Sequence, residues 1–111
     1  MKIRLVLPML AAAAMLAAMP ALAADPEVTL VIKDHQFTPS EVRVPAKVKV
    51  KLIIDNQDAT AEEFESKELK REKVVPPRSK VALFIGPLAP GRYPFVGEFH
   101  EATARGVVIA E

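Results

Sequence analysis

The histidine near the end of the chain, His100, stands among hard oxygen donors. Glu98 precedes it by two residues and Glu101 follows it directly. Carboxylates and imidazole bind Fe, Mn, Zn or Cu(II) far better than Cu(I). On an extended chain, Glu98 and His100 would point to one face while Phe99 points to the other, into the core. The segment is a candidate metal site. A histidine that merely caps a loop among solvated glutamates is the open alternative.

A second acidic segment repeats this arrangement earlier in the chain. If it is extended, Glu63 and Glu65 lie on one face and Phe64 on the other. Together with Glu62 this places three carboxylates within four residues, which repel one another unless a cation or nearby bases compensate. Four bases follow closely: Lys67, Lys70, Arg71 and Lys73. A charged surface held by ion pairs is therefore the open alternative here.

Sulfur chemistry is excluded by composition. The chain has no cysteine, and its four methionines all lie within the first 23 residues. Disulfides, thiolate catalysis, iron–sulfur clusters and thioether ligation are therefore excluded for residues 24–111.

The charge of residues 24–111 is nearly balanced. Without Lys2 and Arg4, 15 − 2 = 13 basic residues remain against 14 acidic residues. This near-neutral balance gives no electrostatic basis for binding nucleic acid.

The first 23 residues read as a secretory signal peptide. Lys2 and Arg4 precede an apolar stretch, which ends at a small-residue site in residues 21–24. Cleavage after Ala23 would leave 111 − 23, or 88, residues for one small domain, residues 24–111. The predicted location is the periplasm. The apolar run is short for a membrane anchor, and no other segment of the sequence is apolar enough to span a bilayer, so no membrane span is expected after cleavage.

The elements that must position these residues read as strands. Short apolar-alternating segments are parted by Pro and Gly, and residues 37–40 read as a turn. About seven strands are predicted: 28–32, 41–44, 48–54, the start of 61–73, 81–85, 92–96 and 106–110. The rest of 61–73 is expected to be irregular or a single turn. This spacing is typical of an all-β Greek-key sandwich or small barrel.

Several of these segments resemble the cupredoxins. Residues 44–47 (Val-Pro-Ala-Lys) are similar to the family's Val-Pro-Ala-Gly turn, and Asn56 begins the loop that would lead to the first metal ligand. Residues 91–100 resemble the Gly-x-Tyr-x-Phe-x-Cys-x-x-His segment of blue-copper proteins. The resemblance covers essentially all of residues 24–111.

The chain departs from that family at the copper ligands. Gly97 stands at the position of the cysteine, and Glu63 stands roughly where the first histidine would be. The region of Ala104 and Arg105 lacks the axial methionine, so His100 alone remains of four donors. A blue-copper centre requires the thiolate. The sequence therefore excludes one.

Four segments resemble one subgroup in particular, the periplasmic cupredoxin-like components of bacterial ferrous-iron uptake systems: residues 62–66, 71–74, 97–100 and 103–106. The resemblance implies a protein that binds iron or copper during import, with an inner-membrane iron permease and other periplasmic subunits as partners. Oxidation of Fe(II) is an activity that the resemblance leaves open. It would require an electron acceptor, and the sequence motifs offer none, so binding is the better supported prediction.

A site of this type would gather Glu63, Glu65, Glu98 and His100 at one end of the sandwich. His35, at a strand end, is a fifth predicted ligand, with a structural hydrogen bond as its alternative. Glu72 and Glu101 are weaker candidates, and Asp58 is weaker still. Such ligands release a metal as falling pH protonates them. A third possibility is a Cu(II) carrier, which would differ from an iron-binding protein in the metal that it prefers under competition.

A different class of function is compatible with the same residues. A cupredoxin fold that has lost its metal could serve as an interaction module that docks a membrane permease or a partner subunit. The two hypotheses differ in one structural respect. Metal binding requires the carboxylates near His100 to converge, whereas docking does not.

Overall fold

The computed structural model describes residues 2–4, 8 and 24–111. The signal peptide predicted over residues 1–23 lies almost wholly outside the described residues and stays a prediction. Among the described residues, no helix has the length and apolar character needed to span a bilayer.

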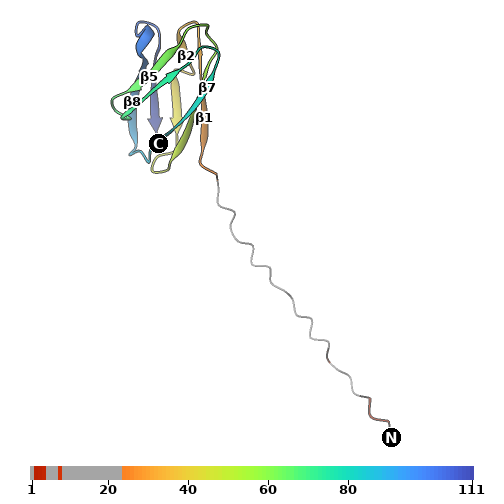
Figure 1. Cartoon of the computed structure of the whole chain (residues 1–111). Coiled ribbons are helices and arrows are strands. Elements are labelled where there is room, and N and C mark those ends of the chain that lie inside the picture. The colour runs from red at the N-terminus through yellow and green to blue at the C-terminus, as the bar shows by residue number, and fades with distance from the viewer. Residues whose placement is uncertain (1, 5–7, 9–23) are drawn as a thin grey trace.

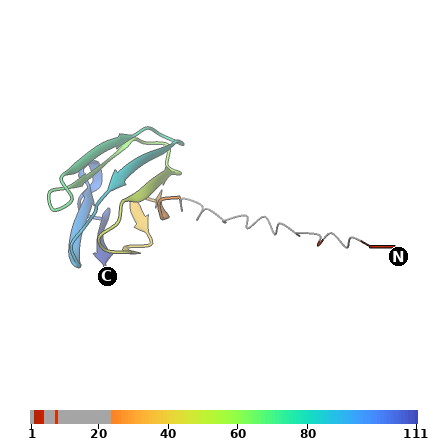
Figure 2. The same cartoon turned by 90° about the horizontal axis from the view of Figure 1, so that it is seen from below.

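Residues 24–111 fold into nine strands and one short 3-10 helix (Figure 1). The strands are β1 Glu27–Lys33, β2 Gln36–Thr38, β3 Glu41–Val44, β4 Val50–Asn56, β5 Glu62–Ser66, β6 Arg71–Val75, β7 Lys80–Ile85, β8 Gly91–Gly97 and β9 Arg105–Ala110, and the helix is η1 Glu98–His100. One sheet has the order β2-β1-β4-β7 and the other β3-β9-β8-β5-β6. Figure 2 shows them as two layers. The predicted all-β sandwich is confirmed, with nine strands rather than seven.

Both sheets are mixed. β1 pairs in parallel with β4, and β3 pairs in parallel with β9, whereas the other pairs are antiparallel. Parallel neighbours require long connections that cross between the layers, and these crossings bring segments distant in sequence to the same end of the sandwich.

The core forms where the inward faces of the two layers meet. Alternating residues of β1 and β4 fill one side, among them Leu30, Ile32, Leu52 and Ile54. Three phenylalanines bridge to the other layer: Phe37, Phe64 and Phe95. The Phe95 ring lies 5.0 Å from the Phe37 ring, edge to face, and 5.1 Å from the Phe64 ring. Such edge-to-face and tilted pairs add to the stabilisation from buried apolar area.

The predicted turn at residues 37–40 was partly wrong, because residues 36–38 form strand β2. β1 and β2 are joined by a two-residue hairpin turn in which Asp34 and His35 have φ values of 52° and 56°. Positive φ at both positions suits the twist of a tight hairpin. Phe37 pairs with Ile32 across the hairpin and is buried. Burial of this side chain therefore favours a strand at residues 36–38, although residues typical of turns follow it.

The irregular segment predicted after Ser66 was also partly wrong. Residues 71–75 form β6, which pairs along its whole length with β5. β6 is the last strand of its sheet, and its first four residues are exposed. An exposed edge strand rich in charge carries little apolar alternation, which explains why its sequence did not reveal it.

The extended conformation predicted for residues 98–100 was wrong. These residues form η1, and Phe99 is 51 % exposed rather than part of the core. The chain reverses here between β8 and β9, and the backbone N–H of Ala104 donates to the carbonyl of His100 over 2.8 Å. Ala104, which is fully buried, fills the core position instead.

Candidate metal site

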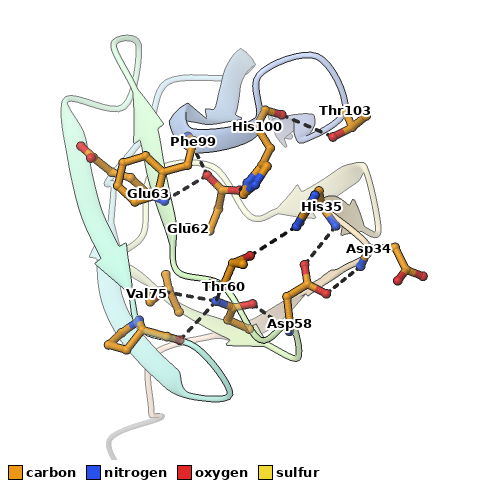
Figure 3. A network of polar contacts seen from close by, with 12 residues as sticks. Asp34, His35, Asp58, Thr60, Glu62, Glu63, Val75, Phe99, His100 and Thr103 are labelled. Atoms are coloured by element: carbon orange, nitrogen blue, oxygen red, sulfur yellow. Dashed lines mark hydrogen bonds and ion pairs between the residues drawn. The ribbon is translucent and has the colours of Figure 1, made fainter.

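The predicted ligands gather at one end of the sandwich, which we call the η1 pole: the β1–β2 turn, β5 with the neighbouring part of β6, and η1. Figure 3 shows His35, Glu63 and His100 there. β8 delivers the chain to this pole through Gly97, and β5 lies beside β8 in the same sheet. The pole therefore combines residues from three parts of the sequence, around positions 35, 63 and 99.

A buried carboxylate, Glu62, lies at the centre of the η1 pole. It is only 1 % exposed because it shares the inward face of β5 with Phe64. Its Oε1 atom accepts hydrogen bonds from the backbone N–H groups of Phe99, at 2.9 Å, and Glu63, at 3.1 Å. Its Oε2 atom lies 2.5 Å from Nδ1 of His100. All of its bonds are thus made within the protein.

Gly97 provides the space for this carboxylate. A Cβ atom on Gly97 would lie 2.6 Å from Cδ of Glu62 and 2.7 Å from Cβ of Ala104. The φ and ψ angles of Gly97, −89° and 106°, are open to any residue. Glycine is needed here because of the close approach of a side chain rather than because of its own backbone conformation.

The two histidines lie against each other. The rings of His35 and His100, which we call the imidazole pair, stack with centroids 3.6 Å apart and planes 15° apart. Nε2 of His35 lies 3.3 Å from the hydroxyl of Thr60. His100 is therefore held at one edge by Glu62 and on one face by His35.

The loop after β4 fixes the position of His35. The carboxylate of Asp58 accepts hydrogen bonds from the backbone N–H groups of Asp34, at 2.8 Å, and His35, at 3.0 Å. Partial burial opposes these bonds, but they lower the pKa of Asp58 below its usual value. Asn56, itself buried, accepts from the N–H of Asp58 and donates to the carbonyl of Thr60. The loop that Asn56 was predicted to begin thus supports the imidazole pair.

Three carboxylates converge on the outer side of the pole. Glu63, Glu72 and Glu98, which we call the acidic cluster, each offer an oxygen within 4.8 Å of the others. Glu63 comes from β5, Glu72 from β6 and Glu98 from η1. Glu65 lies directly across from Glu72 in the β5–β6 register. Like charges placed opposite each other in a sheet are destabilising.

This crowding raises the pKa values of two of the carboxyl groups, those of Glu63 and Glu65. Hydrogen bonding with Glu72, followed by partial desolvation and the negative charges of Glu98 and Glu72, raises the pKa of Glu63 to about 7. Hydrogen bonding with Glu98 and the same charges raise the pKa of Glu65. A cation at this place would relieve the repulsion that a proton relieves here.

Replacing Glu72 by Ala is expected to bring the pKa of Glu63 down from about 7 toward its ordinary value, because the largest cause of the shift is contact with Glu72. Carbon-detected NMR titration of the side-chain carboxyl groups measures this directly. Glu68→Ala, in the nearby β5–β6 turn, is the control and should leave the Glu63 titration in place. An unchanged pKa in the Glu72 variant would contradict the geometry of the acidic cluster.

The nearby bases do not neutralise these carboxylates. Among the salt bridges found within the described residues, none joins Glu63, Glu65, Glu72 or Glu98 to a lysine or arginine. Arg71 instead donates to the backbone carbonyls of Phe84 and Lys70. The alternative of a charged surface held by ion pairs is therefore not what the structure shows.

The structure brings the five predicted ligands to one pole but divides them into two groups. Glu63 and Glu98 belong to the acidic cluster with Glu65 beside it, whereas His35 and His100 form the imidazole pair. Their role as metal ligands stays a prediction.

Sequence reasoning missed one functional candidate, Glu62, and ranked another, Glu72, only as a weaker ligand. The signal for Glu62 was present: alternation that turns Phe64 inward must turn Glu62 inward as well. Glu72 had no comparable signal, because its position depends on the pairing of β6 with β5.

A blue-copper centre does not fit these residues. The chain has no cysteine, and the space beside Gly97 holds the Glu62 carboxylate. The Nδ1 atom of His100 is already bonded to that carboxylate. The prediction that the chain has no such centre is confirmed.

Comparison with known sequences relates the chain to one domain family. The sequence profile described as "Cupredoxin-like domain" matches residues 6–110. The "Uncharacterized protein RP394" of Rickettsia prowazekii (strain Madrid E) is 49 % identical over 83 residues, which cover 75 % of this chain. The match spans 66 % of the length of that curated relative, just under two thirds.

Solved structures with the same fold include copper proteins. Auracyanin A, a "blue" copper protein from Chloroflexus aurantiacus, matches with a TM-score of 0.68 at 11 % identity, over 79 % of this chain and all of its own. Amicyanin from Paracoccus versutus matches with a TM-score of 0.60 at 20 % identity, over 86 % of this chain and 87 % of its own. The metal-binding domain of the Streptococcus pneumoniae D39 Cu(I)-exporting ATPase CopA matches with a TM-score of 0.68 at 9 % identity, covering 77 % and 84 %. At these identities the likeness concerns the fold alone.

Proposed function

This chain belongs to the family of cupredoxin-like domain proteins, and on that premise we propose that it binds an iron or copper ion at the η1 pole. The observation that carries the proposal is the convergence of Glu63, Glu72 and Glu98 from three separate elements without a compensating base among the described residues. The three carboxylates repel one another at this distance, and the repulsion lowers the stability of the fold. A bound cation would offset it.

The spacing of the acidic cluster suits a single ion. Two oxygens on opposite sides of a small divalent cation lie about 4 Å apart, twice a metal–oxygen distance of about 2.1 Å. The cluster oxygens lie within 4.8 Å of one another, so small rotations of exposed side chains would bring them into range. Glu65, beside the cluster, and the imidazole pair at the same pole are the further predicted ligands.

We assign this binding to ferrous-iron uptake in the periplasm, beside an inner-membrane iron permease and other periplasmic subunits. The support is the resemblance of residues 62–66, 71–74 and 97–100 to components of such systems, together with the meeting of these segments at the η1 pole. Carboxylate and imidazole donors suit Fe(II) and Cu(II). The proposal concerns capture and release of the ion, since oxidation would need an acceptor outside this domain.

Neutralising two members of the cluster, in Glu63→Gln with Glu98→Gln, is expected to weaken metal binding by at least about tenfold, because two charged donors are lost. Calorimetric titration with Fe(II) under anaerobic conditions, and with Cu(II), Zn(II) and Mn(II), measures the effect. Glu27→Gln with Glu68→Gln removes the same charge elsewhere on the surface and should leave affinity unchanged. Equal affinity in the cluster variant would contradict the proposed site.

A second candidate function, docking to a protein partner, is favoured by one feature of the same pole. Phe99 is 51 % exposed beside the acidic cluster, and Val74, the cross-strand partner of Glu63, is 50 % exposed. Apolar side chains at a charged surface are typical of protein contacts. If none of the four metals binds the unaltered protein, the docking function replaces metal binding.

A further inference from the structure

We propose that Glu62 is a positioning residue that selects the nitrogen His100 presents to a metal ion: it holds the proton on Nδ1 and leaves Nε2 as the donor. The inference rests on the proposed function only in that a metal binds at the η1 pole. The claim about the imidazole concerns the metal-free protein and can be examined without any ion.

Glu62 accepts two hydrogen bonds from the backbone, which shows its carboxyl group in the role of an acceptor. Oε1 faces two backbone N–H groups, those of Phe99 and Glu63, which can only donate. These two fixed donors orient the carboxylate and direct Oε2 at Nδ1 of His100 over 2.5 Å. We assign the acceptor role to Oε2 as well, which places the hydrogen on Nδ1.

The proton on Nδ1 has a consequence at the opposite edge of the ring. In a neutral imidazole with a hydrogen on Nδ1, the free lone pair is on Nε2. The side chain of His100 is 25 % exposed, whereas that of Glu62 is 1 % exposed. The bonded edge of the ring therefore faces the interior, and the edge carrying the lone pair is left for a ligand.

The ring cannot easily turn to present its other nitrogen. Rotation would break the Glu62 contact at the edge and the stacking with His35, whose centroid lies 3.6 Å away, on the face. His35 is itself held by Thr60 through its ring and by Asp58 through its backbone. A carboxylate that orients a ligating histidine through its other nitrogen is the usual arrangement behind metal-bound imidazoles.

The same carboxylate also positions the acidic cluster. The N–H groups bonded to Oε1 belong to Glu63, a cluster member, and to Phe99, which follows the cluster member Glu98. One buried side chain thus ties the β5 backbone, the η1 backbone and the His100 ring together.

Glu62→Gln separates the effect on the imidazole from the effect on the backbone. The Gln carbonyl oxygen can still accept from both N–H groups, but its amide nitrogen would donate to Nδ1 and force the hydrogen onto Nε2. We expect long-range ¹H–¹⁵N NMR of the metal-free protein, at about pH 8, where imidazole is usually neutral, to show the Nδ1–H tautomer in the unaltered protein and the Nε2–H tautomer in the variant. Glu27→Gln, on the exposed start of β1, is the matched control and should retain the original tautomer.

Two metals then report on the two kinds of donor. Cu(II) favours imidazole, so Glu62→Gln should weaken its binding about tenfold, the usual effect of losing an orienting carboxylate. Mn(II) favours carboxylate oxygens and should change by less than about twofold. His100→Ala should weaken Cu(II) binding to a similar degree, and combining it with Glu62→Gln should add nothing further.

The outcomes distinguish this inference from the proposed function. An unchanged tautomer in Glu62→Gln, or a changed tautomer with unchanged Cu(II) binding, would overturn the role of Glu62. If the unaltered protein binds neither Cu(II) nor Mn(II), the proposed function fails. The tautomers of the metal-free proteins then still support or overturn the assignment of the hydrogen to Nδ1.

Discussion

Replacing Glu62 by Ala should lower the free energy of unfolding of the metal-free protein by about 3 kcal/mol, the scale of removing one partner from a buried charged network. The change leaves the N–H groups of Glu63 and Phe99 and the Nδ1 atom of His100 without their acceptor. It also empties space that is closed to solvent beside Gly97. Urea denaturation followed by circular dichroism measures the difference.

Two further variants make this stability prediction specific. Glu62→Gln keeps an acceptor for both N–H groups and should cost about 1 kcal/mol, the net value of one hydrogen bond. Glu65→Ala, three residues along the same strand, removes a carboxylate crowded by Glu98 and Glu72 and should not destabilise the domain. If Glu62→Ala and Glu65→Ala unfold at the same urea concentration, Glu62 does not hold the pole together.

Truncation of Phe95 to Ala is expected to have the largest effect, a loss of about 4 kcal/mol, as is typical for a fully packed phenylalanine. Phe95 is 2 % exposed and contacts the rings of Phe37 in one sheet and Phe64 in the other. It also packs so closely on Gly106 that a Cβ atom there would lie 2.4 Å from the Phe95 ring. Its loss would therefore open a cavity between the two layers.

Phe99 offers a matched comparison, since it is the same residue type four positions along. Because Phe99 is 51 % exposed, Phe99→Ala should change the free energy of unfolding by less than about 0.5 kcal/mol. Phe95→Leu, which refills part of the cavity, should lie between the two. If Phe95→Ala proves to be as stable as Phe99→Ala, the packing of Phe95 against Phe37 and Phe64 does not hold the two layers together.

The strands that were predicted well carry a clear apolar pattern. Residues 41–44 alternate strictly and form β3 with the predicted bounds, and the apolar run of residues 81–85 forms all but the first residue of β7. In such strands one face packs against the opposite sheet, so the buried positions are apolar and can be recognised in the sequence. The two strands that were missed, β2 and β6, lack this apolar pattern because β2 is three residues long and β6 is an exposed edge strand.

The candidate site was predictable in its location but not in its internal arrangement. The resemblance placed Glu63, Glu98 and His100 at one pole, and the fold does bring them there. The division into an acidic cluster and an imidazole pair depends on η1, a turn that forms because Ala104 rather than Phe99 enters the core. Local alternation contains no information about such an exchange between residues five apart.

The direction of β1 and β9 has a practical consequence for attaching this protein to a surface. β1 runs from Glu27 toward the β1–β2 turn, and β9 runs from η1 toward Ala110, so residues 27 and 110 both lie at the far end of the sandwich (Figure 1). Seven residues of strand separate that end from His35, roughly 20 Å. A biotin tag or an electrode linker joined next to either residue would leave the η1 pole open to the solution. Immobilised assays can therefore test the proposed metal binding there without steric interference from the support.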